Sequence, residues 1–90
     1  MMTVKIIVTG KVQGVWFRKN TKSAADRFNI TGSVENKPDG TVHIIATGEK
    51  EAISQFIAWC EHGDPPAEVM AVSVSEVDGK DFDRFEILRS

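Results

Sequence analysis

The sequence predicts an α+β domain in which two helices lie on one face of an antiparallel sheet. Three observations lead to this fold class. The 90 residues, 41% of them hydrophobic, suffice for one small domain with its own core. Short runs rich in Val and Ile alternate as strands do, whereas two longer segments repeat their apolar residues at helical spacing. The segments follow the order strand, helix, strand, strand, helix, strand, and a further strand ends the series.

The first strand and the first helix are indicated by two different periods. Residues 3–9 (TVKIIVT) are rich in β-branched side chains and predict a strand. From Phe17 to Asn29 the apolar residues recur at offsets of 7, 8 and 11, which places them on one helical stripe. The stripe consists of Phe17, Ala24, Ala25 and Phe28. We expect the helix to end near Asn29, before a Thr-Gly pair.

A hairpin is expected next. Residues 32–36 (GSVEN) and 41–47 (TVHIIAT) predict two short strands. The intervening NKPDG contains Pro, Asp and Gly, which are residues that favour turns. One face of the second strand carries Val42, Ile44 and Ala46, so that face is expected to be buried.

The second half of the chain predicts one more helix and two more strands. In residues 49–63 (EKEAISQFIAWCEHG) the apolar stripe consists of Ile53, Phe56, Ile57 and Cys60, and Gly63 with the following DPP ends the helix. Met70, Val72 and Val74 alternate as a strand. A turn at DGKD, residues 78–81, leads to a last strand with Phe85 and Ile87 facing inward.

This element order is that of the ferredoxin-like, split βαβ fold, βαββαβ plus a final strand. The first two strands would be parallel, because a right-handed crossover through the first helix joins them, and the third strand would lie between them. Parallel strands end at the same edge of a sheet. Arg18 after the first strand, Asn36 at the end of the second and Thr41 at the start of the third are therefore expected on one rim.

The loop TGKVQGVWFRKN, residues 9–20, has the features of an anion site. Gly10 and Gly14 permit backbone conformations that point successive amides the same way. Residues 15–17 then lead into the helix N-terminus, where amides without intrahelical partners and the helix dipole favour a negative charge. Arg18 adds a planar set of donors that suits phosphate oxygens.

Each of these signals also has a structural explanation. An Arg in a first helical turn is usually solvated, and glycines after a strand usually form a turn. Asn36 before KPDG is typical of a residue that begins a turn. On the residues alone both interpretations stay open, and the expected convergence on one rim is what favours an anion site.

Charge and cysteine content exclude several classes of function. The net charge of −2 provides no general attraction to nucleic acid or to an anionic membrane surface. The single cysteine, Cys60, cannot form an internal disulfide. The opening MMTVKIIVTGKV has too short an apolar run for a signal peptide, and no run is long enough for a transmembrane helix. We therefore expect a cytoplasmic protein.

Other reactive residue types are interpreted as structural. His43 and His62 are expected at the surface, and with one cysteine and no close spacing they do not indicate a zinc site. Cys60 is expected in the core, and Trp16 and Trp59 are expected to pack rather than to stack on bases. The acids of VDGKDFD indicate a solvated turn, and no Ser lies in a nucleophile-elbow pattern.

Two motifs, GKVQGVWFR at residues 10–18 and GSVENKPDG at residues 32–40, resemble the acylphosphatase family. The family pattern is a Gly-x-Val-Gln-Gly-Val-x-Phe-Arg loop followed by Gly-x-Val-x-Asn at the end of the second strand. The interval of 18 residues between Arg18 and Asn36 also fits, and the resemblance covers essentially the whole chain. One departure is Ser33, where many members carry a large aromatic side chain, and it concerns the packing of the second strand.

The resemblance implies an enzyme that hydrolyses the carboxyl–phosphate bond of a small acyl phosphate without metal or cofactor. It implies that Arg18 and the loop amides of Gly14, Val15, Trp16 and Phe17 bind the phosphoryl group, and that Asn36 orients the attacking water. Gly10, Gln13 and Thr41 would support this site. Inorganic phosphate would be product and inhibitor.

The alternative is a module that only binds, because the ferredoxin-like fold serves many functions. An RNA-binding version would expose aromatic residues on its central strands, and residues 3–9 and 41–47 contain no Phe, Trp or Tyr. A small-molecule regulatory module, or an accessory domain of a larger acyl-transfer enzyme, stays open. We expect a monomer, although the strand at residues 85–88 could pair at an edge.

Overall fold

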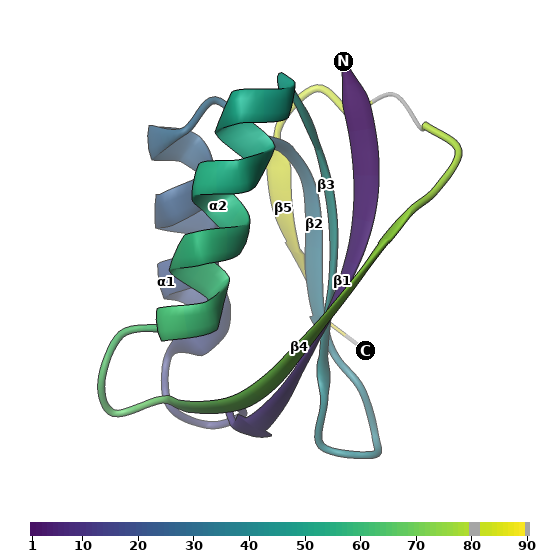
Figure 1. The fold of residues 1–90 in the computed structure, drawn as a ribbon. Helices are drawn as coiled ribbons and strands as arrows, with labels where there is room; N and C mark the ends of the chain where they lie inside the picture. Colours follow the sequence, from purple (N-terminus) through teal and green to yellow (C-terminus); the bar gives the residue numbers. More distant parts are fainter. Residues whose placement is uncertain (80–81, 90) are drawn as a thin grey trace.

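The computed structural model describes residues 1–79 and 82–89 and contains the predicted elements in the predicted order (Figure 1). The strands and helices are β1 (Met2–Lys11), α1 (Phe17–Arg27), β2 (Thr31–Asn36), β3 (Val42–Gly48), α2 (Lys50–His62), β4 (Glu68–Glu76) and β5 (Phe85–Leu88). Both helices lie on the same face of the sheet, and the opposite face is open (Figure 1). The ferredoxin-like α+β prediction is confirmed.

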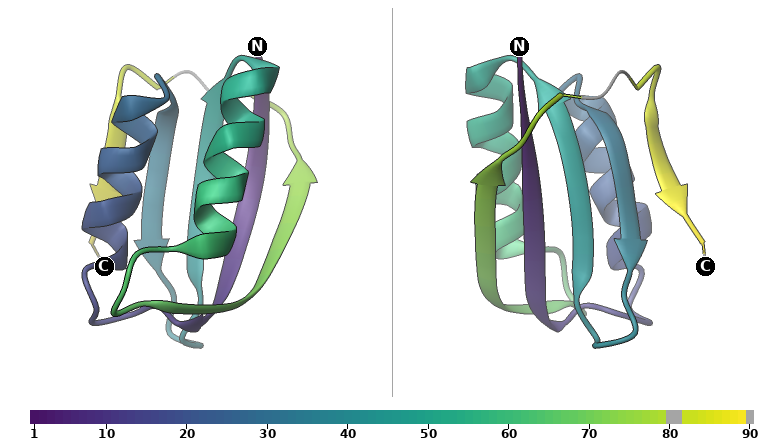
Figure 2. Two further views of the ribbon diagram at one scale, coloured as in Figure 1. Left: turned by 60° about the vertical axis from the view of Figure 1, so that its left-hand side comes forward. Right: turned by 90° about the vertical axis from the view of Figure 1, so that its right-hand side faces the viewer.

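The five strands form one sheet in the order β4-β1-β3-β2-β5. As predicted, β3 lies between β1 and β2, and both pairings are antiparallel. The sheet is mixed rather than wholly antiparallel, because β5 pairs in parallel with β2 (Figure 2). The chain crosses from β4 at one edge to β5 at the other. The predicted turn at residues 78–81 lies partly outside the described residues, since these leave out 80 and 81.

The core fills the space between the sheet and the helices. Its largest buried side chains include Phe17 of α1, Phe56 of α2 and Phe85 of β5. Trp59 stacks on Phe17 at a centroid distance of 5.7 Å and on Phe56 at 6.3 Å, so its predicted packing role is confirmed. The remaining core residues are Val4, Ile6, Val8, Val12, Ala24, Ala25, Ile30, Val34, Val42, Ile44, Ala46, Ile53, Cys60 and Ala67.

The expected alternation of Met70 with Val72 and Val74 is wrong at its first position. Met70 is 81% exposed, whereas Val69 packs on the core. The register between β1 and β4 shifts at Thr9/Gly10, so Met70 is an extra residue on β4. Gly10 has a φ of 136°, and a Cβ there would collide with the carbonyl oxygen of Glu68. A glycine is therefore required where the bulge brings the two backbones together, directly before the site loop.

Helix α1 ends two residues earlier than predicted. The Phe28 amide donates to the carbonyls of Ala24 and Ala25, and Asn29 adopts a left-handed φ of 58°, which Asn tolerates better than most residues. Ser33 is the position at which the sequence departs from the pattern described above. It is buried on the open face of the sheet, where β3 and β5 lie on either side of β2. A small side chain therefore fits a position that is closed by its neighbours.

Candidate active site

The loop between β1 and α1 contains two residues in the left-handed region of backbone conformation. Gly14 has a φ of 74° and Trp16 a φ of 68°, while Val15 between them is not in this region. Residues that alternate between right- and left-handed conformations turn successive N–H groups toward one point. A Cβ at Gly14 would meet open space, so glycine is favoured there by its conformation and not by crowding.

The N-terminus of α1 opens onto the same loop. Trp16 occupies the N-cap position but makes no side-chain capping bond, and the first turn carries no acidic residue among the described side chains. Phe17 begins the helix and anchors it in the core, where it is 1% exposed. The first amides of α1 thus have neither a capping oxygen nor a nearby carboxylate, and they retain their affinity for an anion.

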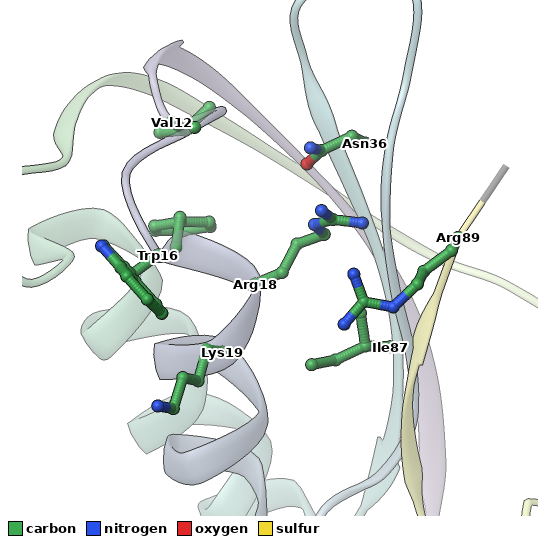
Figure 3. A pocket seen from close by; sticks show the side chains of 9 residues that line it. Val12, Trp16, Arg18, Lys19, Asn36, Ile87 and Arg89 are labelled. Atoms are coloured by element: carbon green, nitrogen blue, oxygen red, sulfur yellow. The ribbon is translucent and has the colours of Figure 1, made fainter.

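Arg18 extends from the first turn of α1 toward β5. Its Nη1 lies 3.4 Å from the carbonyl oxygen of Leu88, a long and solvent-exposed hydrogen bond. Among the described residues Arg18 has no carboxylate partner within salt-bridge distance. Its guanidinium is therefore charged, lightly held and able to meet an incoming oxyanion (Figure 3).

Asn36 is the last residue of β2 and lies on the helix-covered face, opposite the buried Val42 of β3. Its Oδ1 has less than 1 Å² of accessible surface and no hydrogen-bond partner in the described part of the chain. Buried acceptors without a partner are rare and costly. The side-chain amide points into the space that Arg18 also enters (Figure 3).

One cavity of about 410 Å³ contains these groups. Its lining includes three cationic side chains, those of Arg18, Lys19 and Arg89, and no carboxylate among the described residues. Among the described residues the lining is Val12, Gly14, Trp16, Phe17, Arg18, Lys19, Asn36, Ile87 and Arg89. Arg18 and Asn36 therefore lie on one rim, as the topology predicted. The side chains that line the cavity are positively charged, although the net charge of the chain is −2.

Gln13 joins the loop to the hairpin that follows Asn36. Its Nε2 donates to the carbonyl oxygens of Lys37 and Thr41, both at 2.8 Å. Thr41 does not line the cavity: its Oγ1 and its backbone N–H both donate to Asp39 Oδ1, at 2.6 and 3.0 Å, and these bonds hold the pKa of Asp39 below its usual value. Support from Thr41 therefore goes to the turn and reaches the site through Gln13.

Four residues that line the cavity were not predicted from the sequence: Val12, Lys19, Ile87 and Arg89. Ile87 and Arg89 lie there because β5 runs parallel to β2 and so ends at the same rim as Asn36. Knowledge of the β2–β5 pairing would have located both. No local pattern around residues 82–89 specifies that pairing.

Trp16 is also not the packing residue that was expected. Its side chain is 69% exposed, and the Lys19 Nζ lies 5.2 Å from the centroid of its ring. Cys60, in contrast, is buried on α2 as expected, and burial raises the pKa of its thiol to about 12. Because such a thiol stays protonated, it is a structural residue and not a nucleophile.

Comparison with known proteins identifies the family. The acylphosphatase family model matches residues 4–87 of this chain. The chain belongs to the acylphosphatase family. The acylphosphatase of Methylococcus capsulatus is 41% identical over 91 residues, with 99% of this chain and 98% of the relative covered. That of Thiobacillus denitrificans is 40% identical over 80 residues, with 89% and 90% covered.

Solved acylphosphatases have the same fold. The crystal structure from Bacillus subtilis superposes with a TM-score of 0.94 at 37% identity and covers 99% of this chain and 100% of its own. The structure from Coxiella burnetii gives 0.93 at 33% identity, with 97% and 92% covered. Whole-chain similarity at this level supports the same enzyme class, so the protein is an acylphosphate phosphohydrolase that acts on a small molecule.

Two further findings bear on the class of protein. In the part of the chain that the structure describes, no three or more His, Cys, Asp or Glu side chains are grouped so that they could hold a metal ion. No helix within residues 1–79 and 82–89 is both long and apolar enough to cross a membrane.

Proposed function

We propose that Arg18 and the amides of residues 14–18 bind the phosphoryl group of an acyl phosphate, and that Asn36 orients the water that attacks it. The observation that carries this proposal is the single cavity in which Arg18, Asn36 and the uncapped N-terminus of α1 meet without a carboxylate among its described lining residues. Charge stabilisation and positioning account for most of the catalysis of phosphoryl transfer, and these groups supply both.

The phosphoryl group binds where the amides of the loop converge. Its oxygens accept hydrogen bonds from the backbone N–H groups, and the dipole of α1 adds a favourable potential. Arg18 turns from its weak contact with Leu88 to a two-pronged contact with phosphoryl oxygens. As the transition state spreads negative charge over those oxygens, the same donors strengthen their bonds.

Asn36 acts on the water. An amide cannot accept a proton near neutral pH, but the unpartnered Oδ1 can accept a hydrogen bond from a water and so direct a lone pair at phosphorus. The water oxygen bonds to phosphorus while the bond from phosphorus to the acyl oxygen breaks. The carboxylate leaves with that electron pair, and the water proton passes to a phosphoryl oxygen.

The leaving group explains why so few side chains suffice. A carboxylate is a weak base and departs without a general acid. The three cationic side chains of the cavity stabilise the negative charge on the phosphoryl oxygens, a role that a metal ion has in other enzymes. We therefore propose hydrolysis without a metal, by a cytoplasmic monomer that inorganic phosphate inhibits as the product.

Paired alanine variants test the two roles. Arg18→Ala should lower kcat/KM by an amount that corresponds to a loss of about 3–5 kcal/mol of transition-state stabilisation. It should also weaken phosphate binding, because Arg18 contacts the phosphoryl group before and during the reaction. Asn36→Ala should lower kcat by about two to three orders of magnitude with little change in phosphate affinity. Asn36→Asp should not restore activity, since a carboxylate repels the phosphoryl oxygens.

The assay uses acetyl phosphate with excess chelator, and folding is checked by circular dichroism. Arg27→Ala is the matched control, because Arg27 is exposed at the other end of α1. Equal loss of phosphate binding in Asn36→Ala and Arg18→Ala would make Asn36 a phosphoryl ligand. Full turnover of the Asn36→Ala variant would show that Asn36 only forms the turn. Loss of wild-type turnover in the presence of chelator would contradict hydrolysis without a metal.

A further inference from the structure

Trp16 combines a strained backbone with an exposed side chain. Its φ of 68° lies in the left-handed region, which is unfavourable for a bulky residue. Burial of the indole does not offset that cost, since 69% of the side chain is exposed. A large apolar ring held in this way, at the edge of a catalytic cavity, indicates a role in binding.

A second cavity begins where the catalytic one ends. It has a volume of about 370 Å³ and lies between α1 and the segment that follows α2. Its described lining is Trp16, Lys19, Asn20, Pro65 and Pro66, and Trp16 and Lys19 also line the catalytic cavity. The two cavities therefore adjoin at these two side chains, and Trp16 lies on the side of the catalytic cavity away from Asn36 (Figure 3).

The geometry of phosphoryl transfer indicates on which side of the cavity the acyl group lies. In phosphoryl transfer the attacking and leaving oxygens lie roughly in line on opposite sides of phosphorus. If Asn36 holds the water and Arg18 holds the phosphoryl group, the acyl group must extend away from Asn36. In the structure, the space on that side leads to Trp16 and Lys19.

We propose that the second cavity is the acyl subsite and that it favours acyl phosphates with a flat apolar acyl group, such as an aromatic ring. The inference rests on the proposed roles of Arg18 and Asn36. The indole supplies a stacking surface, and the two prolines add further apolar lining. The Lys19 Nζ lies over the indole, 5.2 Å from its ring centroid, and its positive charge suits the carboxylate that leaves.

The test compares benzoyl phosphate with acetyl phosphate. The ratio of their kcat/KM values should fall about five- to tenfold in Trp16→Gly, which is the effect of losing one aromatic stacking contact. Glycine suits the left-handed backbone at this position, so the variant should keep the loop geometry and the fold. Trp16→Phe retains a ring and should keep the ratio within about twofold of the wild-type value.

The ratio is used because the Trp16 amide belongs to the phosphate loop, so a change in the loop affects both substrates alike. Met70→Ala is the matched control, because it removes another exposed apolar side chain that lines neither cavity, and it should not change the ratio. If Trp16→Gly hydrolyses both compounds with the wild-type ratio, the acyl subsite is overturned. If the wild type hydrolyses neither compound, the proposed catalytic site fails as well.

Discussion

At the scale of single residues, Gln13 connects two parts of the site that are distant in sequence. Its two side-chain N–H groups donate to carbonyls on either side of the hairpin turn, so one side chain connects the loop between β1 and α1 to the strand end that carries Asn36. A side chain with this position acts through other residues and not on the substrate.

We predict that Gln13→Glu lowers kcat by at least about tenfold, more than Gln13→Ala does. A carboxylate cannot donate, and it would face two carbonyl oxygens, whereas alanine admits water to them. Steady-state kinetics with acetyl phosphate measure the effect, and protonation of the new carboxyl at low pH should partly restore activity. Equal activity in both variants and in the wild type would show that the loop keeps its place without Gln13.

At the scale of the elements, the open face of the sheet carries a charge cluster around His43 of β3. Burial, followed by the nearby Lys5 and Lys37, lowers the pKa of His43, and these effects outweigh the opposing influence of Asp39 and Glu35. The unfolded chain therefore binds a proton at His43 more readily than the folded chain. The contribution of neutral His43 to the free energy of unfolding is therefore fully present above about pH 6.5. It declines as the pH falls from there toward the lower pKa of His43 in the folded state.

We predict that His43→Gln loses less stability than the wild type between pH 7.5 and pH 5.5, because Gln has no charge to gain. Urea unfolding at several pH values provides the measurement. His62→Gln, at the exposed end of α2, is the control for removing an imidazole elsewhere. A wild-type pH dependence in His43→Gln would assign the effect to the carboxyl groups instead.

The elements also show what the sequence could predict. Each helix and each inner strand has a periodicity that lies within its own residues, so element order and the Arg18–Asn36 convergence followed from local pattern and topology. The parallel pairing of β5 with β2 did not follow, because a strand of four residues does not encode its partner. The bulge at Met70 and the exposure of Trp16 depend on neighbours across the fold and were missed for the same reason.

At the scale of the whole molecule, phosphate binding should stabilise the fold. A ligand that binds only the native state adds RT ln(1 + [L]/Kd), about 2.7 kcal/mol at a hundredfold excess over Kd. For a chain of this length, that corresponds to an increase in Tm of roughly 10–20 °C. We predict this increase for the wild type and Arg27→Ala, and its loss in Arg18→Ala.

Thermal unfolding in phosphate, against chloride at the same ionic strength, measures the shift. The salt control separates a specific anion site from general screening of the charged surface. An equal increase in Arg18→Ala would place the anion at another part of the molecule.

The contact between Arg18 and Leu88 joins residues that are 70 positions apart in the chain. One wall of the candidate cavity is therefore synthesised long after the loop between β1 and α1. While β1, α1, β2 and β3 are already available to fold, the edge of β2 beside Asn36 still lacks β5. Pairings over such long sequence separations form slowly, because the intervening chain must first be ordered. If the proposed site is correct, we expect catalytic competence to appear late in the folding of each new molecule, when β5 pairs with β2.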